Sequence, residues 1–267
     1  MAKVNAIESL TTLRHGREGL GDGTPVDGAP TDSVGHDGAI LFDATRLPQP
    51  QPEWFDPAHW GKRAHAVKDG GRGGAWFIDA PFGAAVLRHY LRGGMAARIS
   101  RDRYMWQGER RTRSFAEFRL TDTLHRQGLP VALPLAASYR REGAFYRAAI
   151  LVERLQDVET FATRVAASAA DAPWEDAGRL IARFHHAGLD HADLNVNNIL
   201  FEATGKGWLI DFDRSQLRRP GDTWRQNNLA RLLRSLQKLR GKRSRTQVEA
   251  DFARLYEAYE AAMVRNA

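Results

Sequence analysis

The sequence contains no cysteine among its 267 residues. This absence excludes disulfide bonds, iron–sulfur clusters, thiolate zinc sites and cysteine nucleophiles. The sequence also lacks any run of about 18 apolar residues, so it predicts no membrane-spanning helix. The first residues lack the long apolar core of a secretory signal, and we therefore expect a protein that stays in the cytoplasm.

The charge balance is basic, whereas the rest of the composition is that of an ordinary globular protein. Hydrophobic residues make up 43% of the chain and charged residues 27%, which argues against a disordered or fibrous protein. Lys and Arg number 39 against 32 Asp and Glu, giving a net charge of +7. This excess favours an anionic partner: nucleic acid, a phosphorylated substrate or an anionic membrane surface.

The chain divides by composition into a short tail and one large domain of the α+β class. Residues 1–38 are small, polar and turn-forming without apolar periodicity, which predicts a flexible tail. Residues 39–267 form the domain, with a strand-rich part at about 39–152 and a mostly helical part at about 153–267. Ser114 with Glu117 predicts a capping box at the start of a helix. The patterns predict strands within 64–92, 131–135 and 148–152, and helices over 113–127, 174–188, 223–240 and 246–264.

The strongest motif is His191-Ala-Asp-Leu-Asn-Val-Asn-Asn-Ile-Leu200, followed by Trp208-Leu-Ile-Asp-Phe-Asp213. It resembles the catalytic loop and metal-binding segment of the protein-kinase-like superfamily, with Asp213 where protein kinases have glycine. The resemblance implies that Asp193 orients and deprotonates the accepting hydroxyl, and that Asn198 and Asp211 hold Mg²⁺. The alternative is a polar turn followed by a hairpin, without catalysis.

The first part of the domain contains candidate nucleotide-binding residues. Gly70-Gly-Arg-Gly-Gly74 resembles a phosphate-covering loop, in which Gly71, Gly73 and Gly74 let the backbone approach ATP, or it is a plain turn. Arg88 stands where kinases have their strand lysine. Its expected ion-pair partner is Glu117, with Glu109 as the competitor. Glu153 falls where kinases join their two lobes and hold adenine through backbone groups.

Two histidines near the motif favour structural roles. His185 and His186 are adjacent in a predicted helix, so their side chains diverge, and no carboxylate–histidine spacing accompanies them. We interpret His185 as support for the loop, and His191 as a loop-fixing residue in preference to a base.

Several longer blocks extend the resemblance beyond the superfamily. They are Leu87-Arg-His-Tyr-Leu-Arg-Gly-Gly94, Arg101-Asp-Arg-Tyr104, Thr112-Arg-Ser-Phe-Ala-Glu-Phe118, the Asp-Leu-Asn loop, Ile210-Asp-Phe-Asp-Arg214 and Trp224-Arg-Gln-Asn-Asn-Leu-Ala-Arg-Leu-Leu-Arg-Ser235. These blocks resemble the lipopolysaccharide kinases that act on 3-deoxy-D-manno-octulosonic acid (Kdo) and on core heptoses. The resemblance covers about 40–260 and implies a bilobal protein-kinase-like fold. It also implies ATP, Mg²⁺ and transfer to the 4-hydroxyl of Kdo on a lipid A precursor, at the cytoplasmic side of the bacterial inner membrane.

Basic residues gather in two segments, 98–113 and 231–245. We expect the first, with Tyr104 and Trp106 at the lipid interface, to bring a peripheral enzyme to an anionic membrane surface. The second is as well explained by a solvated basic face. Three other functions stay open: another small-molecule kinase, such as a heptose or aminoglycoside kinase, a pseudokinase binding module, and a nucleic-acid binder. No nucleic-acid motif accompanies the basic residues, so we expect no nucleic-acid partner.

Overall fold

The computed structural model describes residues 8–13, 38–47, 49–67, 74–91 and 102–265. Two compact units divide the chain: unit 1 comprises 1–115 and 135–151, and unit 2 comprises 116–134 and 152–267. The sequence predicts a division near residue 152, but residues 116–134 group with the second unit.

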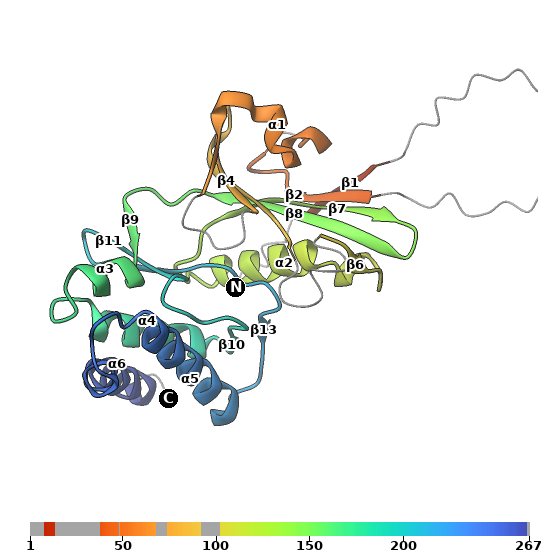
Figure 1. The fold of residues 1–267 in the computed structure, drawn as a ribbon. Helices are drawn as coiled ribbons and strands as arrows, with labels where there is room; N and C mark the ends of the chain where they lie inside the picture. The colour runs from red at the N-terminus through yellow and green to blue at the C-terminus, as the bar shows by residue number, and fades with distance from the viewer. Residues whose placement is uncertain (1–7, 14–37, 48, 68–73, 92–101, 266–267) are drawn as a thin grey trace, which may run out of the picture. The chain divides into compact units, whose positions relative to one another are not determined.

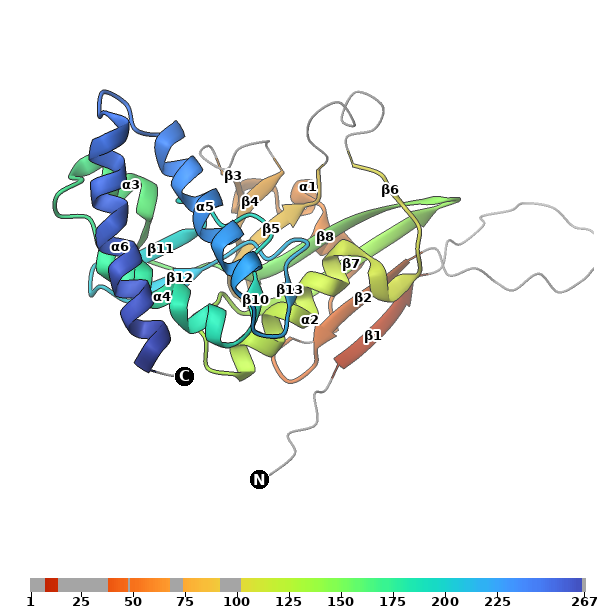
Figure 2. The ribbon, with the colours of Figure 1, turned by 90° about the horizontal axis from the view of Figure 1, so that it is seen from below.

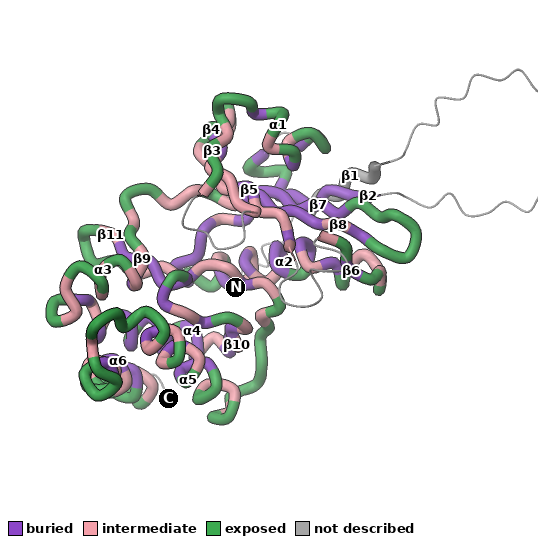
Figure 3. Tube along the Cα trace, in the orientation of Figure 1, coloured by how far each residue is buried: buried purple, intermediate pink, exposed green. Residues whose placement is uncertain are grey.

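Unit 1 is built on an eight-stranded antiparallel sheet (Figure 1). Its path runs β1-β2-β7-β8-β5-β4-β3, and β6 pairs with β8. The sheet's buried face is apolar, and Figure 3 shows buried residues along β2, β7 and β8. The strands are β1 (Glu8–Leu13), β2 (Gly38–Asp43), β3 (Ala64–Ala66), β4 (Ala75–Ala80), β5 (Gly83–His89), β6 (Tyr104–Met105), β7 (Pro134–Glu142) and β8 (Phe145–Glu153).

Part of the predicted tail is a strand. Residues 8–13 form β1, which pairs antiparallel with β2 along its whole length, from Glu8 opposite Asp43 to Leu13 opposite Gly38. The prediction of a flexible tail through residue 38 is therefore wrong for these six residues. The physical reason is that β2 offers a buried edge with which a short, polar segment can pair through its backbone alone.

Short helical segments follow β2 and precede α2. They are η1 (Pro52–Phe55), α1 (Pro57–Trp60), η2 (Gly61–Arg63) and η4 (Glu109–Arg111). Phe55 and Trp60 are buried, and Trp54 stacks on Phe82 with ring centroids 4.7 Å apart. The aromatic residues among the prolines thus pack on the sheet.

Helix α2 (Arg113–Arg126) begins in unit 1 and continues in unit 2. The predicted capping box is wrong, because the helix already includes Ser114 and its hydroxyl donates to the carbonyl oxygen of Ser138 on β7 at 2.8 Å. The Ser114 hydroxyl therefore binds a residue 24 positions away in the sequence and does not cap the helix.

Unit 2 is mostly helical, so the α+β class expected from the sequence is confirmed. Figure 2 shows α4, α5 and α6 side by side. The two small sheets pair β10 with β13 and order β12-β11-β9. The elements are β9 (Val158–Thr160), α3 (Phe161–Ala167), α4 (Trp174–His186), β10 (Leu189–Asp190), β11 (Ile199–Glu202), β12 (Gly207–Leu209), β13 (Gln216–Leu217), α5 (Asp222–Lys238) and α6 (Arg245–Arg265).

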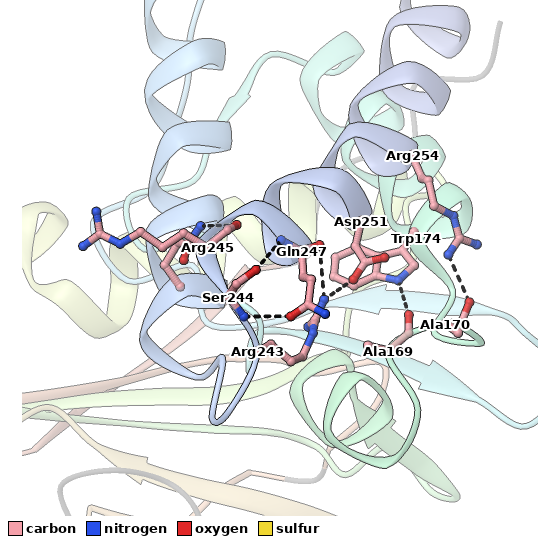
Figure 4. Close-up of polar contacts among 10 residues, drawn as sticks. Ala169, Ala170, Trp174, Arg243, Ser244, Arg245, Gln247, Asp251 and Arg254 are labelled. Atoms are coloured by element: carbon pink, nitrogen blue, oxygen red, sulfur yellow. Dashed lines mark hydrogen bonds and ion pairs between the residues drawn. The ribbon is translucent and has the colours of Figure 1, made fainter.

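Close packing of α4 on α6 organises the core of unit 2. Gly178 permits it, because a Cβ there would lie 2.2 Å from the carbonyl oxygen of Leu255. At the end of α4, Gly188 has φ +83°, as predicted for a helix-terminating glycine. The start of α4 is tied by Trp174, whose indole N–H donates to the Ala169 carbonyl at 2.7 Å, and by Arg254 of α6, which donates to the Ala170 carbonyl at 3.0 Å (Figure 4).

Candidate active site

The three central residues of the motif lie around one hairpin of unit 2. Asn198 immediately precedes β11, and Asp211 follows β12 by two residues. The strands pair antiparallel, with Ile199 opposite Leu209, and the Ile210 N–H donates to the Asn198 carbonyl at 3.0 Å. The hairpin therefore brings together residues that stand 13 positions apart in the sequence, as the motif requires.

Asn198 also closes the loop that contains Asp193. Its Nδ2 donates to the backbone carbonyl of Asp193 at 2.9 Å, and the residue is buried. This bond fixes the orientation of the amide and makes Oδ1 the atom able to bind a cation. Asp193, by contrast, is exposed, which is a requirement for a residue that contacts a substrate.

His191 is held in one neutral tautomer. Its Nε2 lies 3.1 Å from the carbonyl oxygen of Ile210, which only accepts, so Nε2 carries the hydrogen. Its Nδ1 then accepts from the Asp193 N–H at 3.1 Å. Burial lowers the pKa of His191, which favours the same neutral form. His191 thus connects the loop to the segment before Asp211, which is the loop-fixing role that the sequence predicts.

Asp211 has a backbone conformation that non-glycine residues rarely adopt. Its φ is +64°, in the left-handed region. Such a residue costs on the order of 1–3 kcal/mol and persists only where its surroundings enforce it. The next residue, Phe212, is buried and packs against His191 with ring centroids 5.4 Å apart. The strained backbone of Asp211 is therefore fixed by the hairpin before it and by the buried Phe212 after it.

Helix α5 supports the loop from a second side, and the sequence motif does not reveal this. Asn228 is buried; its Oδ1 accepts from the His191 N–H at 2.9 Å, and its Nδ2 donates to Asp190 at 2.8 Å. Arg231 donates to the His191 carbonyl at 3.2 Å, and the Ser235 hydroxyl accepts from the Val196 N–H at 3.2 Å. Positions 228, 231 and 235 share one helix face, and polar residues at this spacing among leucines are the signal that would have found them.

A third support comes from the segment after Asp211. The Ser215 hydroxyl accepts from the Ala192 N–H at 3.0 Å. Arg218 forms an ion pair with Asp190 at 2.7 Å, so one carboxylate receives both Arg218 and Asn228. These contacts hold the start of the loop at β10.

His185 is buried and packs on α6, so support of the catalytic loop by its side chain stays a prediction. Its Nδ1 lies 2.9 Å from the Tyr259 hydroxyl of α6, and burial lowers the pKa of His185 to about 3. Among the described residues, no group of three or more His, Asp or Glu side chains is placed to hold a metal ion. Mg²⁺ in phosphoryl-transfer sites needs fewer protein ligands, because substrate phosphates and waters complete its shell. The Asn198 amide oxygen and the Asp211 carboxylate fit that donor set.

The predicted nucleotide-binding residues are only partly described. Gly71 and Gly73 lie outside the described residues. Gly74 precedes β4 at a close approach of the chain, where a Cβ would lie 2.8 Å from the Leu91 side chain. Arg88 lies on β5 opposite Ala75, with its guanidinium 4.9 Å from the Tyr90 ring.

The two candidate partners of Arg88 lie in different units. Glu117 is buried on α2 and groups with unit 2. Glu109 belongs to unit 1, and its carboxylate accepts from the Tyr139 hydroxyl at 3.0 Å. The pairing of Arg88 with Glu117 stays a prediction. Glu153 is exposed at the end of β8, and its N–H donates to the Leu133 carbonyl at 2.8 Å.

The expected lipid-contacting aromatics belong to the packing of unit 1. Tyr104 is buried against Tyr146, and Arg113 covers its ring at 4.6 Å. Trp106 packs on Tyr139 with ring centroids 5.1 Å apart. The prediction that Tyr104 sits at a lipid interface is therefore wrong, because its ring is buried against Tyr146 and covered by Arg113.

Comparison with known proteins identifies close relatives. The sequence model described as the lipopolysaccharide kinase (Kdo/WaaP) family matches residues 57–259. A 3-deoxy-D-manno-octulosonic acid kinase of Xanthomonas euvesicatoria pv. vesicatoria (strain 85-10) is 63% identical over 99% of both chains. One of Stenotrophomonas maltophilia (strain R551-3) is 56% identical over 99% of both. A solved glucosamine kinase (crystal form B) has TM-score 0.44 and 14% identity over 86% of this chain and 79% of its own, too slight a likeness to carry an argument.

Proposed function

The chain belongs to the lipopolysaccharide kinase (Kdo/WaaP) family, and we propose that it phosphorylates a Kdo sugar in lipopolysaccharide biosynthesis. The observation that carries this proposal is the identity of 63% over 99% of a relative named for that activity. More finely, we propose that the γ-phosphoryl group of ATP is transferred to the 4-hydroxyl of Kdo on a lipid A precursor.

Asp193 is the proposed general base. The acceptor hydroxyl gives its proton to the Asp193 carboxylate while its oxygen forms the new bond to the γ-phosphorus. The bond from phosphorus to the oxygen bridging to the β-phosphate breaks, and that oxygen leaves with ADP. The exposure of Asp193 and the bonds that fix the backbone on both sides of it support this role.

Asn198 and Asp211 are the proposed metal ligands. Bound Mg²⁺ would neutralise charge that develops on the nucleotide phosphates. The Asn198 side chain has its Nδ2 committed to the Asp193 carbonyl, which turns its oxygen toward the role of ligand. The unusual φ of Asp211 supports a functional position for its carboxylate.

The proposed nucleotide-binding residues are those to which the family resemblance assigns this role. Gly71, Gly73 and Gly74 would approach the phosphates through their backbone N–H groups. Arg88 would bind phosphate oxygens, with Glu117 as its ion-pair partner. Backbone groups around Glu153 would receive the adenine ring.

The acceptor also suggests where the protein works. The described residues contain no helix long and apolar enough to cross a membrane. We propose peripheral association with the cytoplasmic side of the bacterial inner membrane, because the acceptor is a lipid and the chain carries a net charge of +7.

The proposal is tested with the purified full chain, ATP, Mg²⁺ and a Kdo-bearing lipid A precursor. We expect a product heavier by one phosphate, with the phosphorus on the Kdo 4-oxygen in the NMR spectrum. Heptose-bearing core and aminoglycosides serve as competing acceptors in parallel reactions. Phosphorylation of one of these without phosphorylation of Kdo overturns the acceptor assignment, and nucleotide binding without any turnover overturns the kinase assignment.

A further inference from the structure

The connection between α5 and α6 is the most one-sided charged segment in the described part of unit 2. Residues 223–248 contain eight Lys and Arg residues and no Asp or Glu. Five of these cations fall between Lys238, the last residue of α5, and Arg245, the first of α6. We refer to residues 238–245 as the α5–α6 turn.

The cations of the turn are exposed. Lys238, Arg240, Lys242 and Arg245 are all exposed, and within the described residues none of them forms an ion pair. Arg243 is the exception, since it pairs with Asp251 of α6. Four of the five cations of the turn are therefore presented to solvent without an ion-pair partner among the described residues.

The backbone of the turn is fixed before any partner arrives. Ser244 and Gln247 form a reciprocal cap at the start of α6: the Gln247 N–H donates to the Ser244 hydroxyl at 3.1 Å, and the Ser244 N–H donates to Gln247 Oε1 at 2.8 Å (Figure 4). Gln237 of α5 donates to the Arg245 carbonyl at 3.3 Å, which ties the two helices across the turn. Gly241 supplies the positive φ of +60° that the reversal needs.

Leu239 indicates what kind of anionic partner the turn fits. It is 57% exposed although it stands directly between Lys238 and Arg240. An apolar side chain among cations suits the boundary of an anionic bilayer, where it enters the acyl region while the charges meet headgroups. The turn contains no aromatic residue on which a nucleic-acid base would stack.

The turn is also close to the catalytic loop along α5. Ser235, which bonds to the loop at Val196, precedes Lys238 by three residues, or about 4.5 Å of helix axis. A contact at the turn would therefore hold the loop near a surface from which a lipid-anchored sugar projects.

From these observations we infer that the α5–α6 turn is a docking surface for an anionic lipid bilayer. The inference deepens the proposed function, because it names the partner that presents the acceptor. It is a surface separate from the basic segment 98–113, of which only Tyr104 is excluded from a lipid contact by its burial.

The test measures co-sedimentation of the full chain with vesicles of phosphatidylcholine alone or mixed with phosphatidylglycerol. We expect binding to the mixed vesicles that weakens as salt rises. The triple variant Lys238→Ser, Arg240→Ser, Lys242→Ser should lose about a hundredfold in partitioning, because each cation contributes about fivefold. Leu239→Ser should weaken binding several-fold without changing its salt dependence. A matched control replaces three exposed cations elsewhere in unit 2, Arg179→Ser, Arg183→Ser and Lys206→Ser, and should bind nearly as the wild type does.

Each other outcome overturns the inference. It fails if the triple variant binds as the wild type does, or if the control loses as much. It also fails if the chain ignores both kinds of vesicle but retains duplex DNA or RNA through the turn. A parallel kinase assay on a short water-soluble Kdo acceptor shows that the variants fold. If the wild type shows no activity on this acceptor, the proposed function is rejected, whereas the vesicle-binding measurement still tests the docking surface.

Discussion

Asn228 offers the sharpest test of the support beneath the catalytic loop. The variant Asn228→Asp keeps the shape of the side chain and an oxygen that accepts from the His191 N–H, 2.9 Å away. It loses the amide donor that now lies 2.8 Å from the Asp190 carboxylate and places a second carboxylate there. The residue is 1% exposed, so water cannot replace the lost donor.

The expected cost in free energy of unfolding is about 2–4 kcal/mol. The lost hydrogen bond to a charged group accounts for about 1.5–3 kcal/mol, and repulsion between the buried carboxylate at position 228 and the half-buried Asp190 for the rest. For a domain of this size the melting temperature should fall by about 5–15 °C. Turnover should fall as well, since the anchored backbone of His191 adjoins the loop of Asp193.

The deficit should depend on pH with a defined sign. In the folded variant one member of the carboxylate pair takes up a proton that the unfolded chain has released above about pH 4. The folded state then binds more protons than the unfolded state, so stability falls as pH rises, by up to about 1.4 kcal/mol per unit. Calorimetry at about pH 5 and about pH 8 should show the larger deficit at the higher pH.

The exchange variant Asp190→Asn with Asn228→Asp provides the control. It restores one amide donor and one carboxylate acceptor across the same pair, while the His191 N–H keeps its acceptor. We expect a favourable coupling of about 1–3 kcal/mol between the two changes, although Arg218 then faces an amide in place of a carboxylate. Additive effects of the two single changes, within about 0.5 kcal/mol, would refute the assignment of Asn228 as the support of the loop.

Four further predictions follow from the site and the core. Asp193→Ala should lower turnover by about 10²–10⁴ with an unchanged melting temperature, whereas Glu260→Ala, an exposed control on α6, should leave both unchanged; near-normal turnover would remove Asp193 from the base role. Asn198→Ala and Asp211→Asn should raise the Mg²⁺ concentration needed for half-maximal turnover, with partial rescue by added Mg²⁺; kinetics independent of Mg²⁺ would contradict the ligand assignment. Gly178→Ala should destabilise the fold by about 1–3 kcal/mol in thermal melts despite the better helix propensity of alanine, because its Cβ meets the Leu255 carbonyl; a raised melting temperature would disprove the clash. Because burial lowers the pKa of His185 to about 3, the unfolded chain binds more protons below its ordinary pKa of about 6.5, so stability should fall as pH drops through that range and the slope should flatten in His185→Gln.

The residues that the sequence reveals are those whose partners are close in the chain. Asp193 and Asn198 stand five positions apart on one loop, and a hairpin of two short apolar runs returns the chain to Asp211. The spacing of these residues in the sequence is therefore fixed by local geometry and can be recognised without the structure. The long helices α4, α5 and α6 are predicted to within about two residues for the same reason, since their apolar periodicity is a local property.

What the sequence misses depends on partners far away in the chain. Asn228 reaches back 37 residues to the loop, and the Ser114 hydroxyl reaches forward 24 residues to β7. Tyr104 is buried by Tyr146 on a neighbouring strand. The apolar pattern of the six residues of β1 is too weak to predict a strand. These residues form one because they pair with the edge of β2. No local window contains these partners, so propensity and periodicity could not predict which groups these residues contact.

The residues that support the catalytic loop share one property, which explains why its motif can be recognised from the sequence. They bind the main chain: the His191 N–H is held by Asn228, the Ala192 N–H by Ser215 and the Val196 N–H by Ser235. Because these bonds need only a peptide group on the loop side, they fix its path without dictating its side chains. The side chains that remain specified are those with a task of their own, Asp193, Asn198 and the packed His191. Replacing Asp193 should therefore remove chemistry and spare the path of the loop, whereas replacing Asn228 should disturb the path and reduce turnover through it.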